Sequence, residues 1–119
     1  MSLQSLPHFT INTLRLHQLI EQLSHIGKQE GKTGLYRPAF SPADDQARRW
    51  FSEVCQAAGI DVYEDAACNM IARIGPKDKS AIATGSHLDT VAGGGHLDGA
   101  YVSLQVWKRY FLLRNKIFL

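Results

Sequence analysis

The stretch from Ala81 to Ala100 constrains this chain most, because it places histidines and carboxylates close together around a glycine-rich loop. A short run of small apolar residues, Ala81–Ala83, is typical of a buried strand. The sequence His-Leu-Asp follows at residues 87–89 and recurs at residues 96–98. Such residues on a loop that follows a strand are a common setting for a metal site, and a solvated polar loop is the alternative. From the residues alone, four side chains are candidate ligands: His87, Asp89, His96 and Asp98.

The spacing of His87 and Asp89 is suited to a paired histidine and carboxylate. In an extended segment, residues two apart point to the same side, so the two side chains can lie together. Asp89 then either accepts a hydrogen bond from the imidazole ring of a metal-bound histidine or binds the metal itself. The glycines at residues 93–95 allow the backbone to turn tightly and to approach an ion or a substrate.

Two amphipathic helices are predicted upstream of this stretch. Apolar residues recur with helical spacing over residues 16–26, Asn12 or Thr10 is placed to cap that helix, and Gly27 ends it. The second helix begins at Ser41, where a serine cap is followed by proline and two aspartates. Its predicted buried face consists of Ala47, Trp50, Phe51, Val54 and Ala58.

A β-hairpin is predicted after the second helix. Residues 60–64 alternate between apolar and polar side chains, which indicates a strand. Residues 65–69 form a polar turn, and residues 70–74 are predicted to return as the second strand before Gly75-Pro76. Helices followed by short strands indicate an α/β fold.

The chain resembles the aminoacylase/carboxypeptidase-like family of di-metal hydrolases in its metal-binding signature, Gly85-Ser86-His87-Leu88-Asp89-Thr90-Val91, then Gly93-Gly94, then Asp98-Gly99-Ala100. Two upstream segments are similar to the branch that contains allantoate amidohydrolase, N-carbamoyl-L-amino-acid hydrolase and β-ureidopropionase-type enzymes: Arg37-Pro38-Ala39-Phe40-Ser41-Pro42 and Asp65-Ala66-Ala67-Cys68-Asn69-Met70. The resemblance runs from about Leu14 to Ala100. It implies part of a metallopeptidase-like (phosphorylase/hydrolase-like) catalytic domain, with N-terminal helices and a small mixed sheet.

The resemblance also implies roles for the candidate residues. The histidine that matches His87 binds one metal ion, and the aspartate that matches Asp98 bridges both ions. The aspartate that matches Asp89 orients the histidine and is not a ligand, and the position of His96 is usually not a ligand. The position of Cys68 is usually glycine, so a positive φ there would strain the cysteine.

The implied cofactors are two Zn²⁺ or Mn²⁺ ions. The implied reaction is hydrolysis of a ureido or amide C–N bond in a small substrate, such as allantoate or an N-carbamoyl amino acid. The family's general-base glutamate and its further metal ligands are expected beyond Leu119. We therefore expect the chain alone to be inactive and to bind metal weakly.

Residues 101–119 depart from the family's pattern. Val102 stands where the family has a glycine, and the residues after it are more aromatic and basic than the family's small-residue helix. We interpret residues 1–119 as the truncated N-terminal part of a metal-dependent hydrolase catalytic domain, with 101–119 as a divergent tail. The alternative is a non-catalytic domain that self-associates, because a truncated sheet leaves its edges bare. In both cases we expect a homo-oligomer.

Composition excludes several other classes of protein. A net charge of +2 is too small to indicate a nucleic-acid partner, and we expect none despite the basic and aromatic tail. We expect no membrane partner, because no apolar run is long enough to span a bilayer. No secretory signal is evident, and Cys55 and Cys68 lack the spacing of a metal-binding pair. We therefore expect a reduced, cytoplasmic protein.

Overall fold

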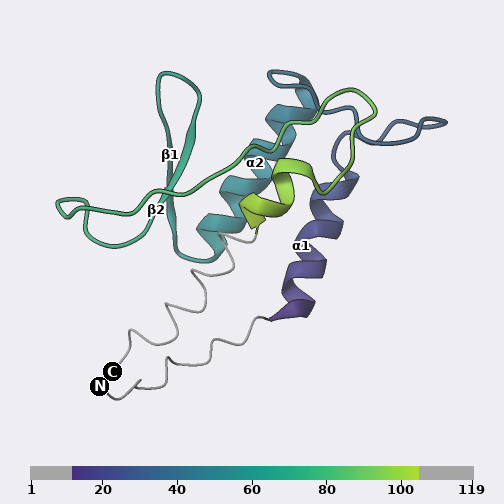
Figure 1. Ribbon diagram of the computed structural model, residues 1–119. Coiled ribbons are helices and arrows are strands. Elements are labelled where there is room, and N and C mark those ends of the chain that lie inside the picture. The colour runs from purple at the N-terminus through teal and green to yellow at the C-terminus, as the bar shows by residue number, and fades with distance from the viewer. Residues whose placement is uncertain (1–11, 105–119) are drawn as a thin grey trace, which may run out of the picture.

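A computed structural model describes residues 12–104, in which three helices pack together and a β-hairpin extends to one side (Figure 1). Helix α1 spans Thr13–His25 and helix α2 spans Pro42–Ala57. A third helix begins at residue 98 and is described as far as residue 104. Strands β1, Asp61–Glu64, and β2, Met70–Arg73, form an antiparallel pair. Most of the predicted tail lies outside the described residues.

Helix α1 begins and ends where the sequence predicts. The Asn12 side chain accepts a hydrogen bond from the Arg15 N–H at 3.0 Å, so Asn12 is the N-cap. Thr10, the other candidate, lies outside the described residues. Leu19 and Leu23 are buried, and Gly27 follows the helix with a φ of 93°, which residues with a Cβ rarely adopt.

Two reciprocal hydrogen bonds close the start of helix α2. The Ser41 hydroxyl accepts from the Asp44 N–H at 3.2 Å, which confirms the predicted cap. The Asp44 carboxylate accepts in turn from the Phe40 N–H at 3.0 Å, and Asp44 is itself buried. The first contact satisfies an N–H group that the first turn of a helix leaves unpaired, and the second fixes the residue that precedes the cap.

The apolar core joins all three helices and the residue before β1. Ala47 and Ala58 are buried as predicted, whereas Trp50, Phe51 and Val54 are half-buried against the core. Removing each large aliphatic side chain from water stabilises the fold by roughly 1.5–3 kcal/mol. The core therefore fixes the third helix, which begins at Asp98, against α1 and α2. Its buried members are Leu19, Leu23, Ile26, Ala47, Cys55, Ala58, Ile60, Ala100 and Leu104.

The predicted hairpin is confirmed, and its turn is organised by Asp65. The Asp65 carboxylate accepts from the Ala67 and Asn69 N–H groups and from the Asn69 side-chain amide, each at 2.9 Å. Cys68 has a φ of 63°, so the positive φ considered from the sequence is present. A cysteine at that φ is strained relative to glycine.

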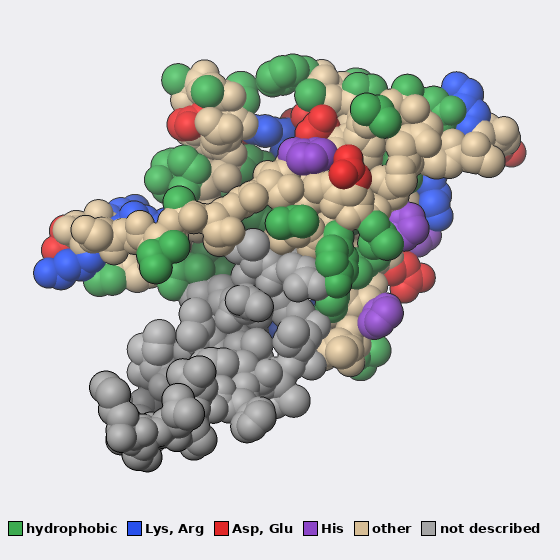
Figure 2. All heavy atoms as spheres, viewed as in Figure 1, with side chains coloured by type: hydrophobic (Ala, Val, Ile, Leu, Met, Phe, Trp, Pro, Cys, Tyr) green, Lys and Arg blue, Asp and Glu red, His purple; other side chains and the backbone are tan. Residues whose placement is uncertain are grey.

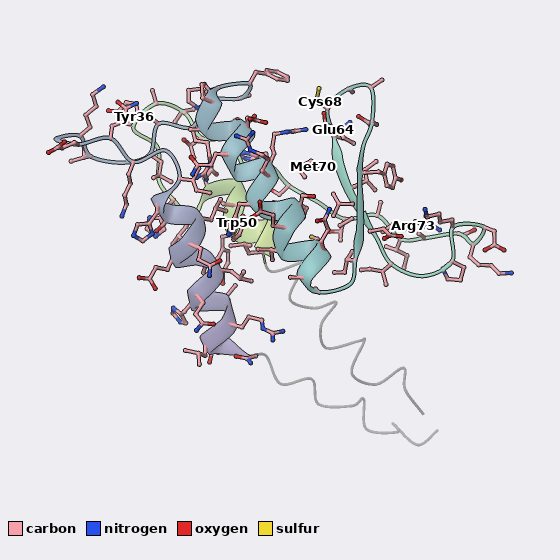
Figure 3. All side chains as sticks on the ribbon, turned by 180° about the vertical axis from the view of Figure 1, so that it is seen from behind. Tyr36, Trp50, Glu64, Cys68, Met70 and Arg73 are labelled. Carbon is pink, nitrogen blue, oxygen red and sulfur yellow. The ribbon has the colours of Figure 1, made fainter. Side chains whose placement is uncertain are left out.

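Arg48 ties the hairpin to helix α2. Its Nη2 donates to the Glu64 carboxylate at 2.6 Å and to the Cys68 carbonyl at 2.7 Å. Glu64 and Cys68 lie at the turn end of the hairpin, and Arg73 lies at its other end (Figure 3). The hydrogen bond that Arg48 donates to the Glu64 carboxylate raises the pKa of Arg48, so this guanidinium keeps its charge.

The prediction of a buried strand at Ala81–Ala83 is wrong, and with it the prediction of a mixed sheet. Residues 80–91 have no strand structure, and the Ile82 side chain is 99% exposed. A strand needs a hydrogen-bonded neighbour, and in residues 12–104 the sheet contains only the antiparallel pair β1 and β2. Over the same residues, no helix has the length and apolar character required to cross a membrane.

Candidate functional site

The candidate residues lie on an irregular segment, residues 87–98, that an upstream loop holds in place. Leu35 pairs with Gly94 through two backbone hydrogen bonds of 2.9 and 3.1 Å. The Thr90 N–H donates to the Arg37 carbonyl at 2.8 Å, and the Thr90 hydroxyl accepts from the Arg37 N–H at 3.2 Å. The segment is therefore attached at two points, Thr90 and Gly94, to residues more than fifty positions earlier.

Glycines allow the two loops to meet backbone to backbone. A Cβ on Gly34 would collide with the carbonyl group of Gly93, and both residues have positive φ. A Cβ on Gly94 would come within 2.9 Å of the Val91 carbonyl oxygen. Gly34 in the upstream loop thus admits the backbone of Gly93, and Gly94 allows its own loop to turn tightly against Val91.

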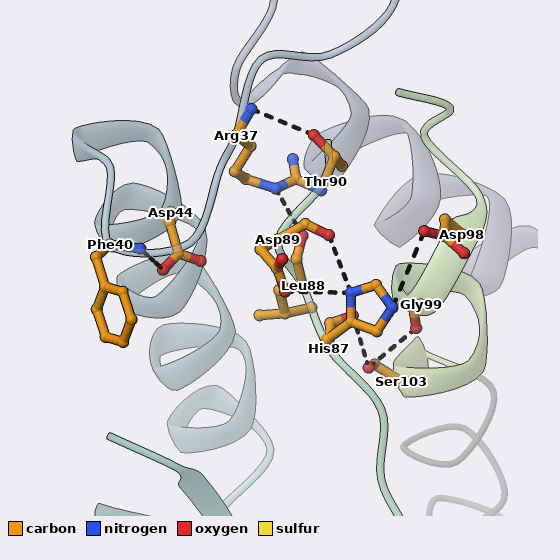
Figure 4. Close-up of polar contacts among 10 residues, drawn as sticks. All are labelled: Arg37, Phe40, Asp44, His87, Leu88, Asp89, Thr90, Asp98, Gly99 and Ser103. Atoms are coloured by element: carbon orange, nitrogen blue, oxygen red, sulfur yellow. Dashed lines mark hydrogen bonds and ion pairs between the residues drawn. The ribbon is translucent and has the colours of Figure 1, made fainter. Parts of the chain in front are cut away.

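His87 lies between two carboxylates (Figure 4). Its Nδ1 is 3.1 Å from the Asp89 Oδ1 and 3.0 Å from the Asp89 carbonyl oxygen. Its Nε2 is 3.9 Å from the Asp98 Oδ2. Because both atoms facing Nδ1 are acceptors, the proton of the neutral ring belongs on Nδ1, and Nε2 keeps its lone pair toward Asp98.

The imidazole ring of His87 packs against the first turn of the third helix. The ring lies directly over Gly99, where a Cβ would overlap its Cδ2 and Nε2 atoms. The Ser103 hydroxyl donates to the carbonyl oxygens of His87, at 3.4 Å, and Gly99, at 3.2 Å. Gly99 is part of the motif that the chain shares with the family, and the packing of the His87 ring explains why a glycine is needed there.

Arg37 is a site-supporting residue that the sequence indicated only as part of the resemblance. Its guanidinium is fully buried and donates to the Leu88 carbonyl, next to His87, at 2.8 Å. Burial lowers its pKa, while the negative charges of Asp44 and Asp89 oppose that shift. Nothing in the local sequence distinguishes this arginine from an exposed one.

Of the four candidate ligands, the structure brings three together: His87, Asp89 and Asp98. His96 is exposed. Asp89 faces Nδ1, so the donors that remain are the His87 Nε2 and the Asp98 Oδ2, 3.9 Å apart. That separation is within twice a zinc–ligand distance of about 2.1 Å, so the two atoms fit one shared ion.

Few of the described side chains are arranged so that they could bind a metal ion together. Within residues 12–104, no group of three or more histidine, cysteine, aspartate or glutamate side chains has the geometry to hold a metal ion. Structural and catalytic zinc sites use about three or four protein ligands. The described residues therefore present two possible donor atoms, the His87 Nε2 and the Asp98 Oδ2, with the His87 ring oriented by the Asp89 carboxylate.

The sequence of the chain is similar to those of several amidohydrolases. The chain is 39% identical over 88 residues to an N-carbamoyl-L-amino acid amidohydrolase of Geobacillus stearothermophilus, which covers 71% of this chain and 21% of that protein. It is 30% identical over 76 residues to the allantoate amidohydrolase of Escherichia coli K12, which covers 62% of this chain and 18% of that protein. No family model matches the chain.

Solved structures agree with the sequence relatives. A crystal structure of a hydantoinase/carbamoylase family amidase from Burkholderia ambifaria superposes with a TM-score of 0.80 at 33% identity. The match covers 90% of this chain and 27% of that chain. The chain spans about a fifth of the length of the curated relatives it matches. The chain, with its three described helices and antiparallel hairpin, is therefore homologous to part of the hydantoinase/carbamoylase family of amidohydrolases.

Proposed function

We propose that this chain supplies part of the active site of a metal-dependent amidohydrolase that cleaves a ureido or amide C–N bond. The observation that carries the proposal is the position of His87, with Asp89 on one ring nitrogen and Asp98 facing the other. The relatives support the substrate class, because they are named for N-carbamoyl amino acids and allantoate. Both compounds contain a carbonyl carbon bonded to nitrogen.

Each of the three residues has a distinct proposed role. The His87 Nε2 and the Asp98 Oδ2 would be donors to a Zn²⁺ or Mn²⁺ ion, and the resemblance implies that Asp98 would also be a ligand of a second ion. Asp89 holds the proton on Nδ1, which keeps the Nε2 lone pair available and the ring in one orientation. When bound, divalent ions supply a polarised carbonyl and an activated water.

The remaining ligands and the proton-transferring glutamate are proposed to correspond to the part of the relatives' length that this chain does not match. Two donor atoms fall short of the about four ligands that one zinc ion takes. The chain alone should therefore bind metal weakly and hydrolyse no substrate. Hydrolysis of N-carbamoyl amino acids by the purified chain at about 1 s⁻¹ or faster would contradict this.

Titration of the purified chain with Zn²⁺ tests the assignment of ligands. We expect weak binding that the His87→Ala and Asp98→Asn variants each reduce at least about tenfold, because a lost ligand costs no less than a lost orienting group. His96→Ala is the matched control, since His96 is an exposed histidine of the same segment. Isothermal titration calorimetry gives the affinities.

Two results would count against the assignment. One is an equal loss of zinc affinity in the His96→Ala control, which would mean that any histidine on this segment binds the ion. The other is undiminished affinity in both the His87→Ala and Asp98→Asn variants, which would place the donors elsewhere.

A further inference from the structure

Arg37 makes an unusual set of contacts for a charged residue. It is fully buried, and it is the largest fully buried side chain of the described residues. Its Nε donates to the Leu88 carbonyl at 2.8 Å, and its Nη1 donates to the Leu23 and Ile26 carbonyls at 3.0 and 2.6 Å. Its Nη2 is buried without a hydrogen-bond partner among the described residues. The hydrogen bonds of the guanidinium thus go to backbone carbonyls.

The contacts with Leu23 and Ile26 satisfy the end of helix α1. The last carbonyls of a helix lack intrahelical partners, and together they carry the negative end of the helix dipole. Removing a guanidinium from water costs much free energy. The interaction of the buried Arg37 cation with these carbonyls offsets part of that cost. The C-terminal end of helix α1 thus holds the guanidinium of Arg37 in place.

The contacts with residues 88 and 90 hold Asp89 from both sides. The guanidinium binds the carbonyl of Leu88, while the Arg37 backbone pairs with both the N–H and the hydroxyl of Thr90. Hydrogen bonds to the residues on both sides of Asp89 restrict its backbone, and the direction of a side chain follows from the backbone that carries it. The side chain in between is the carboxylate that lies on the His87 Nδ1 (Figure 4).

We propose that Arg37 is the positioning residue of this site: it ties the end of helix α1 to the Leu88 carbonyl and thereby aims the Asp89 carboxylate at the His87 imidazole. The importance of Arg37 for catalysis rests on the proposed function, in which the His87 ring that it helps to orient is a metal ligand. The structural claim, that Arg37 controls the tautomer of His87, stands without any metal.

Nitrogen-15 NMR of the histidine rings in the full chain tests this claim. In the unmutated protein, His87 should be found mainly as the Nδ1–H tautomer. Arg37→Lys keeps the charge but loses the fork that reaches three carbonyls, so the His87 shifts should move toward those of the exposed His17. Arg48→Lys is the matched control, because Arg48 also donates to a backbone carbonyl, but in the hairpin.

A second readout is the zinc affinity of the same variants, which Arg37→Lys should weaken about 10- to 100-fold while Arg48→Lys leaves it unchanged. Unchanged His87 nitrogen shifts in folded Arg37→Lys would overturn the proposal. A shift in tautomer in a chain whose zinc binding does not depend on His87 would support the positioning role and contradict the proposed function instead.

If Arg37→Lys does not fold, the unmutated protein decides the question. The Nε–H of Arg37 should exchange slowly with solvent and show a coupling across its hydrogen bond to the Leu88 carbonyl. Rapid exchange of that proton, as for an exposed arginine such as Arg49, would overturn the proposal.

Discussion

His87 can occupy its place because Gly99, at the start of the helix over residues 98–104, has no side chain. The imidazole covers the position where a Cβ would stand. Its other neighbours are the Asp89 and Asp98 carboxylates, which face its two nitrogens. The orientation of the ring therefore depends on the absence of a Cβ at residue 99 as well as on the contact with Asp89.

Gly99→Ala should displace the imidazole and weaken zinc binding by at least about tenfold, comparable to the loss of an orienting group. Alanine is the better helix former, so the helix itself should not be weakened. Gly95→Ala is the control, because a Cβ there would meet no atom within 4 Å. Zinc titration and circular dichroism of both variants measure the effect. Equal affinities of the two variants would show that the contact with Gly99 does not position the ring.

The β-hairpin illustrates how one side chain organises an element. Asp65 accepts hydrogen bonds from Asn69 and Ala67, and these bonds, with the Asn69 side chain first, hold the pKa of its carboxyl below the usual 3.8. A carboxylate that is exposed can still direct a turn, because it binds N–H groups of its own segment. The same turn carries the positive φ of Cys68.

The turn should lose stability in acid. Because the pKa of Asp65 is lower in the folded chain than in the unfolded chain, its stabilisation is present above pH 3.8 and is lost as the pH falls through the folded-state value. The amide proton shifts of Ala67 and Asn69 should titrate below pH 3.8, and Asp65→Ala should abolish that titration. Asp78→Asn, in the next loop, should leave it intact. A midpoint at or above 3.8 would refute the role given to these hydrogen bonds.

Several large apolar side chains of the described residues lie on the surface of the molecule instead of in its core. Ile82, Phe40 and Val91 are 99%, 84% and 75% exposed. Figure 2 shows hydrophobic side chains on the surface beside charged ones. Ile82 also belongs to the extended segment that has no strand neighbour among the described residues. Exposed apolar side chains beside unpaired backbone favour association with another chain.

We therefore expect the purified chain to self-associate, and Ile82→Lys to weaken that association. Thr84→Lys is the control, because it adds the same charge to the same exposed segment without removing a large apolar side chain. Sedimentation velocity over a range of protein concentrations gives the association constants. A monomer at every concentration of the unmutated chain would end this expectation, and equal effects of the two variants would assign the association to charge.

The sequence by itself determined the local features of this protein. The caps Asn12 and Ser41, the ends of both helices and the turn at residues 65–69 depend on residues within one helical turn or one hairpin, so their patterns can be read directly. The pairing of His87 with Asp89 is local in the same sense, because the two residues are two positions apart.

Only the tertiary structure decided what depends on distant parts of the chain. Ala81–Ala83 has the composition of a strand, yet strand formation needs a neighbour, which the described residues do not provide. Arg37 holds the Leu88 carbonyl from 51 positions away, and no local pattern reveals that contact. Asp98 faces His87 because the core places the third helix against α1 and α2. Hydrogen bonds between distant segments and the packing of helices are properties of the folded chain, and they set the geometry on which any metal chemistry here depends.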